Sequence, residues 1–240
     1  MYNFNIIKHN SPCINNRNQD ISMLVYHYTA CSFAVTHKVF TKPASEGGLS
    51  CHYVIDTDGS IHQYVDESKR AWHAGNSMWG DIKQDINSAS IGIEVINDGF
   101  NVKTNSCSPY TKEQIESCIL LGQAIMGKYN IKPYNVVAHS DIAPTRKIDP
   151  GPHFPWKHLA DHNIGLFPSK SEINDQKIDK MPSDKELINL FQQYGFTDTS
   201  NLDNLKKAFQ MHYNPTVFLD KKPFSLVEVK ILQSLINIKN

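Results

Sequence analysis

Alternating apolar and polar positions predict a series of short β-strands in the first part of the chain. The clearest runs are 21–29, 51–56, 60–65, 90–96 and the short apolar run 136–138. In the fourth run, isoleucine and valine occupy one face, which leaves Gly92 and Glu94 on the other. The Asp58-Gly59 pair between the second and third runs is typical of a hairpin turn.

Helical spacing of apolar residues predicts one main helix among these strands. It runs over 111–129 and begins with a capping-box sequence, Thr111 with Gln114. A shorter helix is predicted over 32–40, and the polar and aromatic segment 71–76 is predicted to be a loop that lines a site. Strands interleaved with helices indicate an α/β layered domain with a central sheet.

The pattern changes after residue 167, which predicts a second, smaller domain. Residues 168–182 are polar, charged and without periodicity, so we predict a linker there. Residues 183–240 return to helical spacing and predict three short helices, two of which start with Ser-x-x-Glu capping signals. The predicted organisation is a catalytic domain (1–167), a linker (168–182) and a small helical domain (183–240).

Composition and charge restrict the class of protein. With 24 basic and 24 acidic residues the formal net charge is zero, which argues against a nucleic-acid partner bound through bulk charge. No apolar run is long enough to span a bilayer, and residues 1–10 lack the pattern of a signal peptide. The five cysteines include no CxxC pair, so neither a disulfide framework nor a thiolate zinc site is expected.

The candidate site residues lie where two predicted strands end. His27 ends the first run, and His139 follows 136–138, before a proline-rich loop that carries Lys147 and Asp149. Residues two apart in extended backbone point to the same side, so Lys147 and Asp149 are expected to face one site. Two imidazoles and one carboxylate suit a catalytic zinc ion, which lowers the pKa of a bound water toward ~7.

Each of these residues also has an ordinary structural explanation. A histidine at a strand end is more often a hydrogen-bonded core or surface residue, and an aspartate before proline can simply start a turn. Glu94 is either a general base near the zinc or a glutamate that faces solvent from an edge strand. Lys147 is either a group that stabilises an oxyanion or a solvated loop lysine. From the residues alone, both explanations stay open.

Several blocks together resemble a known family. They are Val25–Ala30, Ser50–Tyr53, Ala71–Gly75, Ser90–Glu94 and His139–Pro152. Their order is similar to that in zinc-dependent N-acetylmuramoyl-L-alanine amidases of the amidase-2 family, akin to peptidoglycan recognition proteins, and especially to the AmiD branch, with AmpD enzymes as relatives. The resemblance covers about 21–167. It continues at 194–196 and 208–213, which resemble that branch's peptidoglycan-binding-like helical domain.

The resemblance implies a fold and a site. The fold is a mixed central β-sheet flanked by helices, followed by a small three-helix C-terminal domain. The implied cofactor is Zn2+, with His27, His139 and Asp149 as its ligands, and the implied catalytic residues are Glu94 and Lys147. The residues implied to line the substrate groove are Trp72, His73, Ala143 and Pro144.

The implied reaction is hydrolysis of the amide between N-acetylmuramic acid, or its 1,6-anhydro form, and L-Ala of the peptidoglycan stem peptide, in cell-wall turnover or recycling. Peptidoglycan or muropeptides are the expected partners, whereas the oligomeric state is not readable. The AmiD branch implies the periplasm or cell envelope, and the missing signal pattern leaves the cytoplasm as the alternative. The competing function is a non-catalytic recognition module, which the complete set of implied ligands and catalytic residues disfavours.

Overall fold

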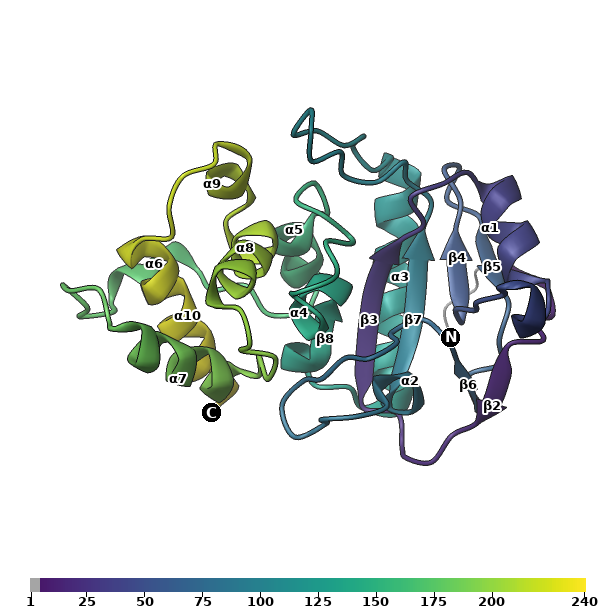
Figure 1. The fold of residues 1–240 in the computed structure, drawn as a ribbon, viewed down its shortest axis with the longest axis horizontal. Coiled ribbons are helices and arrows are strands. Elements are labelled where there is room, and N and C mark those ends of the chain that lie inside the picture. Colours follow the sequence, from purple (N-terminus) through teal and green to yellow (C-terminus); the bar gives the residue numbers. More distant parts are fainter. Residues whose placement is uncertain (1–4) are drawn as a thin grey trace.

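A six-stranded mixed sheet lies at the centre of the protein, as the computed structural model, which describes residues 5–240, shows (Figure 1). The strand order is β1–β5–β4–β7–β3–β8; β4 and β5 are antiparallel and the other neighbours are parallel. The strands are β1 (Ile6–Lys8), β3 (Met23–Tyr28), β4 (Tyr53–Ile55), β5 (Ile61–Gln63), β7 (Ser90–Val95) and β8 (Val136–Ala138). A second, two-stranded antiparallel sheet pairs β2 (Ile14–Asn16) with β6 (Lys69–Ala71).

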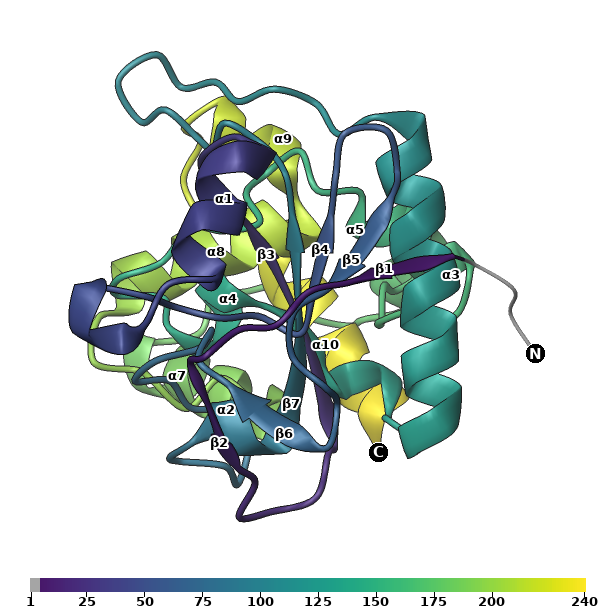
Figure 2. The same cartoon turned by 90° about the vertical axis from the view of Figure 1, so that its right-hand side faces the viewer.

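Helices cover both faces of the central sheet, which confirms the predicted fold class. The long helix α3 lies on one face, and α1, α4 and α8 lie on the other (Figure 2). Before the C-terminal region the helices are α1 (Phe33–Phe40), α2 (Ile86–Ala89), α3 (Lys112–Tyr129), α4 (His139–Ile142) and α5 (Trp156–Asp161), with 3-10 turns at Ala44–Glu46 and Pro133–Asn135. The predicted capping box of α3, Thr111 with Gln114, is present.

Side-chain alternation assigns each strand residue to one of these two faces. Leu24 and Tyr26 of β3 pack in the cluster that includes α3, whereas Met23 and Val25 pack in the cluster on the opposite face. By the same alternation His27 falls on the face away from α3. In β7 the isoleucines and the valine share one face, as predicted. This face packs toward α3, so Glu94 faces away from that helix.

The C-terminal helices lie beside β8 and share a buried core with the sheet (Figure 1). They are α6 (Lys170–Asn174), α7 (Asp184–Tyr194), α8 (Leu202–Tyr213), α9 (Pro215–Leu219) and α10 (Leu226–Lys239). The three predicted helices are α7, α8 and α10, whereas the short α9 between α8 and α10 was not predicted. One contact across the boundary joins Trp79 and Phe196, whose ring centroids are 5.0 Å apart.

Several short elements differ from the sequence prediction. Helix α6 lies inside the predicted linker, where Ser169 and Glu172 form a capping box, and the single-turn helix α4 begins where only a loop was predicted. Elements of three to five residues contain too few positions to show a period. Within 5–240, no helix is both long and apolar enough to cross a membrane, and part of the segment used for the signal-peptide prediction, residues 1–4, lies outside the described residues.

Candidate metal centre and active site

Three neighbouring parallel strands bring the predicted site residues to one edge of the sheet. β7, β3 and β8 are adjacent and parallel, so their carboxyl ends meet at that edge. His27 of β3 lies opposite Glu94 of β7 in the strand register, and His139 directly follows β8. The loop after α4 returns to the same place, because the Ser140 N–H donates to the Asp149 carbonyl over 3.0 Å.

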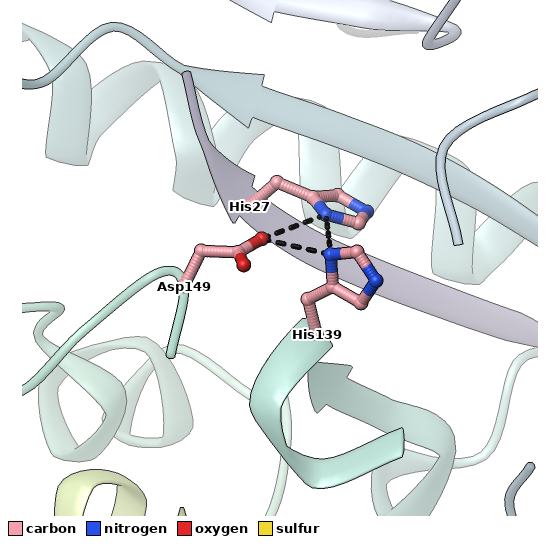
Figure 3. Close-up of side chains that lie close together, drawn as sticks. All are labelled: His27, His139 and Asp149. Carbon is pink, nitrogen blue, oxygen red and sulfur yellow. Dashed lines mark hydrogen bonds and ion pairs between the residues drawn. The ribbon is translucent and has the colours of Figure 1, made fainter. Parts of the chain in front are cut away.

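His27, His139 and Asp149 form a tight, buried triangle (Figure 3). Nδ1 of His27 lies 2.9 Å from Nδ1 of His139 and 3.0 Å from Oδ2 of Asp149, and the third side, from His139 Nδ1 to Asp149 Oδ2, is 2.9 Å. The three residues are at most 7% exposed. The structure therefore brings the three predicted ligands together.

The outer nitrogen of His139 fixes where this ring carries its proton. Nε2 lies 3.1 Å from the Ala74 carbonyl, which can only accept a hydrogen bond. Nε2 is therefore the protonated nitrogen of the neutral ring. Its Nδ1 then presents a lone pair to the centre of the triangle.

A longer chain of hydrogen bonds fixes His27 in the same way. The Ser90 hydroxyl donates to the Ile86 carbonyl over 2.6 Å, so its oxygen accepts from His73 Nε2–H at 3.2 Å. His73 Nδ1 is then unprotonated and accepts from His27 Nε2–H at 2.9 Å. The neutral His27 ring therefore also presents an Nδ1 lone pair to the triangle.

Three electron-pair donors thus face one another with no hydrogen between them. This arrangement is repulsive unless a cation sits among them, and it fits a divalent metal held by two imidazoles and a carboxylate. A tetrahedral ion with bonds of ~2.0–2.1 Å places its ligand atoms roughly 3.3 Å apart, close to the observed triangle. Three protein ligands leave a fourth position for water or substrate, as in catalytic zinc sites.

A cavity of about 570 Å³ opens beside the triangle. Its lining includes His139, Asp149 and the two predicted catalytic residues, Glu94 and Lys147. The predicted groove residues divide into two pairs. Trp72 and His73 line the cavity, whereas Ala143 and Pro144 are buried and lie outside its lining. A cavity of this size lies within the usual range of small-molecule binding sites.

Comparison with known proteins now identifies the family. The Amidase_2 family model, described as N-acetylmuramoyl-L-alanine amidase, matches residues 17–152. This chain belongs to the N-acetylmuramoyl-L-alanine amidase family. The amidase AmiD of Escherichia coli (strain K12) is 36% identical over 216 residues, which cover 82% of this chain and 76% of AmiD.

Solved structures of amidases share the whole architecture. AmpDh3 from Pseudomonas aeruginosa, in complex with anhydromuramic pentapeptide, superposes with a TM-score of 0.82 at 31% identity and covers 91% of this chain and 92% of that one. AmiD from E. coli, in complex with the substrate anhydro-N-acetylmuramic acid-L-Ala-D-gamma-Glu-L-Lys, gives 0.80 at 34% identity, over 91% and 89%. The similarity thus extends across both the sheet and the C-terminal helices of this amidase-family chain.

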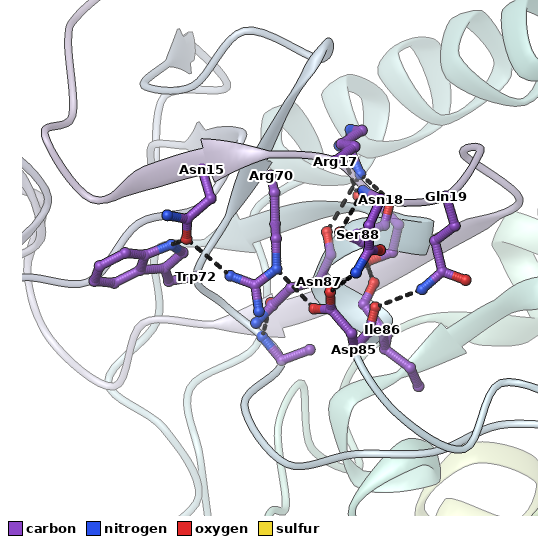
Figure 4. Close-up of polar contacts among 12 residues, drawn as sticks. Asn15, Arg17, Asn18, Gln19, Arg70, Trp72, Asp85, Ile86, Asn87 and Ser88 are labelled. Carbon is purple, nitrogen blue, oxygen red and sulfur yellow. Dashed lines mark hydrogen bonds and ion pairs between the residues drawn. The ribbon is translucent and has the colours of Figure 1, made fainter.

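Polar contacts from β2 and α2 hold the cavity wall of this family member in place (Figure 4). Asn87 of α2 accepts the backbone N–H groups of His73 and Ala74 on its side-chain oxygen, at 2.9 and 2.7 Å. The Trp72 indole donates to Asn15 Oδ1 over 2.6 Å. A Cβ at Gly92 would lie 2.7 Å from the His73 ring, so only glycine lets this ring rest against β7.

The carboxyl group of Glu94 has a pKa that is shifted into the neutral range. Burial raises the pKa of Glu94 to about 8; the charge of Asp149 adds to this rise, and the charge of Lys147 opposes it. Its Oε2 is buried without a hydrogen-bond partner among residues 5–240. A carboxyl group that titrates near neutral pH and lines the cavity suits a general base.

The pKa values of the buried histidines are lowered, whereas that of Glu94 is raised. Burial, and next the charge of His139, lower the pKa of His27 to about 4. Burial lowers the pKa of His52 to about 3 and that of His73 well below its usual value. Burial opposes ionisation of Asp149, yet the adjacent His139 and His27 rings hold the pKa of this carboxyl well below its usual range. His27 and Asp149 are therefore in the protonation states that bind a metal ion at neutral pH.

These shifts predict that the metal-free protein is most stable near pH 6.5. His27, with a folded pKa of about 4 against 6.5 unfolded, binds fewer protons when folded, so its stabilisation is lost as the pH falls below 6.5. His52 acts in the same sense. Glu94, with a folded pKa of about 8 against 4.5, holds its proton when folded, so its stabilisation is lost as the pH rises toward 8. Below pH 6.5 the two histidines take up protons on unfolding, whereas only one glutamate releases a proton. The free energy of unfolding is therefore expected to fall as the pH falls below 6.5.

Urea unfolding in excess chelator between pH 4.5 and 8.5 measures this profile. Glu94→Gln is expected to remove the decline above pH 6.5 and to keep the rise below it. A free energy of unfolding that increased steadily through pH 8 in the unmodified chain would contradict the assigned proton on Glu94.

Proposed function

We propose that this chain is a zinc-dependent N-acetylmuramoyl-L-alanine amidase. It hydrolyses the amide between the lactyl group of N-acetylmuramic acid, or of its 1,6-anhydro form, and L-Ala of the peptidoglycan stem peptide. The observation that carries this proposal is the triangle of three buried electron-pair donors at the cavity that also holds Glu94 and Lys147. Family membership and the anhydromuramyl peptides bound to AmpDh3 and AmiD support the substrate class.

In the proposed mechanism His27, His139 and Asp149 hold the zinc ion. When bound, zinc supplies a Lewis acid that lowers the pKa of a water molecule and polarises a carbonyl group. Glu94 accepts the proton of the attacking water while the water oxygen bonds to the carbonyl carbon. Lys147, which lines the same cavity, stabilises the negative charge that develops on the carbonyl oxygen. Glu94 then returns the proton to the leaving nitrogen of L-Ala as the carbon–nitrogen bond breaks.

Two further parts of the interpretation stay predictions. One is the division into a catalytic domain (1–167) and a peptidoglycan-binding-like domain (183–240). The other is the location, for which we propose the periplasm or cell envelope by similarity to AmiD, with the cytoplasm as the alternative. Cell fractionation tests the second, and pull-down with cell walls tests the binding role of the helices.

The test of the proposed activity is incubation of the purified chain with intact and 1,6-anhydro muropeptides, followed by mass spectrometry. The expected result is release of free stem peptide, loss of this release with a chelator, and its return when zinc is added. Muropeptides that stayed intact while zinc was bound would make the chain a recognition module. The relative rates on the two substrates would separate wall recycling from wall remodelling.

A further inference from the structure

Helix α4 connects several parts of the candidate site. His139 is its first residue, and Ser140 N–H donates to the Asp149 carbonyl over 3.0 Å, so two of the proposed ligands depend on the placement of this one turn. At the other end of the turn, Ala143 accepts the backbone N–H of Lys147 over 3.0 Å. A small shift of α4 would therefore move both ligands and Lys147 together.

One carboxylate holds the start of this turn. Asp141 Oδ2 accepts the Ala138 N–H over 2.8 Å, which closes α4 onto the end of β8. The same oxygen accepts from His212 Nδ1 over 2.7 Å. His212 belongs to α8, so the second bond comes from the C-terminal helices. Both residues are at most 3% exposed.

The His212 ring has little freedom to point elsewhere. It stacks between Trp156 and Tyr213, with ring centroids 4.0 Å and 3.9 Å away and interplanar angles of 19° and 5°. Its Nδ1 is therefore directed at Asp141 by two aromatic planes, one from α5 and one from its own helix. The position of the His212 ring therefore sets the position of Asp141, and through it that of α4.

Stability alone does not account for this pair. It lies beside an apolar cluster that includes Val137, Ile142 and Phe209, and an ionisable pair in such a place contributes no more stability than apolar side chains of similar volume. Asp141 Oδ1 is also buried without a hydrogen-bond partner among residues 5–240, which is a further cost. What the pair supplies is a defined position for the turn that carries His139.

We propose that His212 is a positioning residue for the metal site, supplied by the C-terminal helices through Asp141. The inference rests on the proposed function, because it assumes that His139 and Asp149 bind zinc. It assigns the C-terminal helices a part in building the site, in addition to any contact with the cell wall.

The test compares three variants by zinc affinity, measured by competition with a chelator, and by the absorption spectrum of the Co2+-loaded protein. His212→Leu fills the space between the two rings without a donor, and we expect ~10–100-fold weaker zinc binding and an altered cobalt spectrum. His212→Asn keeps an N–H donor near the place of Nδ1 and is expected to restore most of the affinity. Tyr213→Phe is the matched control on the same helix, α8. It removes the 2.8 Å hydrogen bond between the Tyr213 and Tyr194 hydroxyls but keeps the ring that stacks on His212.

The outcomes separate this inference from the proposed function. If the unmodified chain binds zinc and His212→Leu binds it equally well, the positioning role is wrong. It is also wrong if Tyr213→Phe weakens zinc binding as much as His212→Leu does, because the effect would then be general loosening of the helices. Should His212→Leu not fold, an affinity of His212→Asn no better than a tenth of the unmodified value would overturn the role. An unmodified chain that binds no zinc would instead contradict the proposed function.

Discussion

Replacing His139 by alanine is expected to abolish zinc binding and amidase activity together. The substitution removes one of three proposed ligands and leaves a two-donor site, whereas catalytic zinc sites use three protein ligands. Loss of Lewis-acid stabilisation worth several kcal/mol corresponds to a fall in kcat/KM of ~10³ or more. Metal content after dialysis, measured by atomic absorption, and stem-peptide release from muropeptides check both parts.

His158→Ala is the matched control for this experiment. His158 is an exposed histidine on α5 that lies outside the cavity lining, so its loss should change neither zinc content nor rate. If His139→Ala retained one zinc per chain, the ligand assignment would be wrong even if activity fell. If it lost zinc but kept full activity, the proposed mechanism would be wrong.

Replacing Glu94 by glutamine is expected to leave zinc bound and to lower kcat by ~10²–10⁴. Glutamine has nearly the same shape but cannot take a proton from water, so the ground state is preserved while proton transfer is lost. KM should therefore change little. Steady-state kinetics, together with zinc content, measure the two effects separately.

Glu116→Gln on the exposed face of α3 serves as the control, because it changes the same charge far from the cavity lining. A Glu94→Gln enzyme with an unchanged kcat would remove this residue from the chemistry. Loss of zinc in the same variant would instead mean that Glu94 helps to hold the ion.

The elements that the sequence predicted are those long enough to show a period or a cap. In β7 the alternation of isoleucine with Gly92 and Glu94 predicted which residues share a face, and the capping residues Thr111, Ser183 and Ser225 predicted three helix starts. The single turn α4 has no such sign, because Ala138 before it is not a capping residue by type and the carboxylate that closes the turn lies inside it.

The three residues that the structure brings together in the triangle were singled out from the sequence, whereas most contacts around them were not. Strand ends and a braced loop indicated the three proposed ligands, and the family resemblance added their roles. The bonds that orient these ligands join side chains far apart in sequence, as between His27 and His73 or between Asp141 and His212. A pattern along the chain contains no record of such contacts, so His73 was predicted only as a groove residue and His212 was missed.

The alternation in β3 also limits how the gene for this chain can change. His27 lies four residues after Met23, on the same face, and each added or deleted residue within the strand turns all later side chains to the opposite face. A single codon inserted between Met23 and His27 would turn the imidazole toward the apolar layer of α3 and direct a neighbouring tyrosine into the metal centre. Insertions of two codons would preserve the facing but move the ring by one strand repeat. Length variation among natural variants should therefore be confined to the loops on either side of this strand.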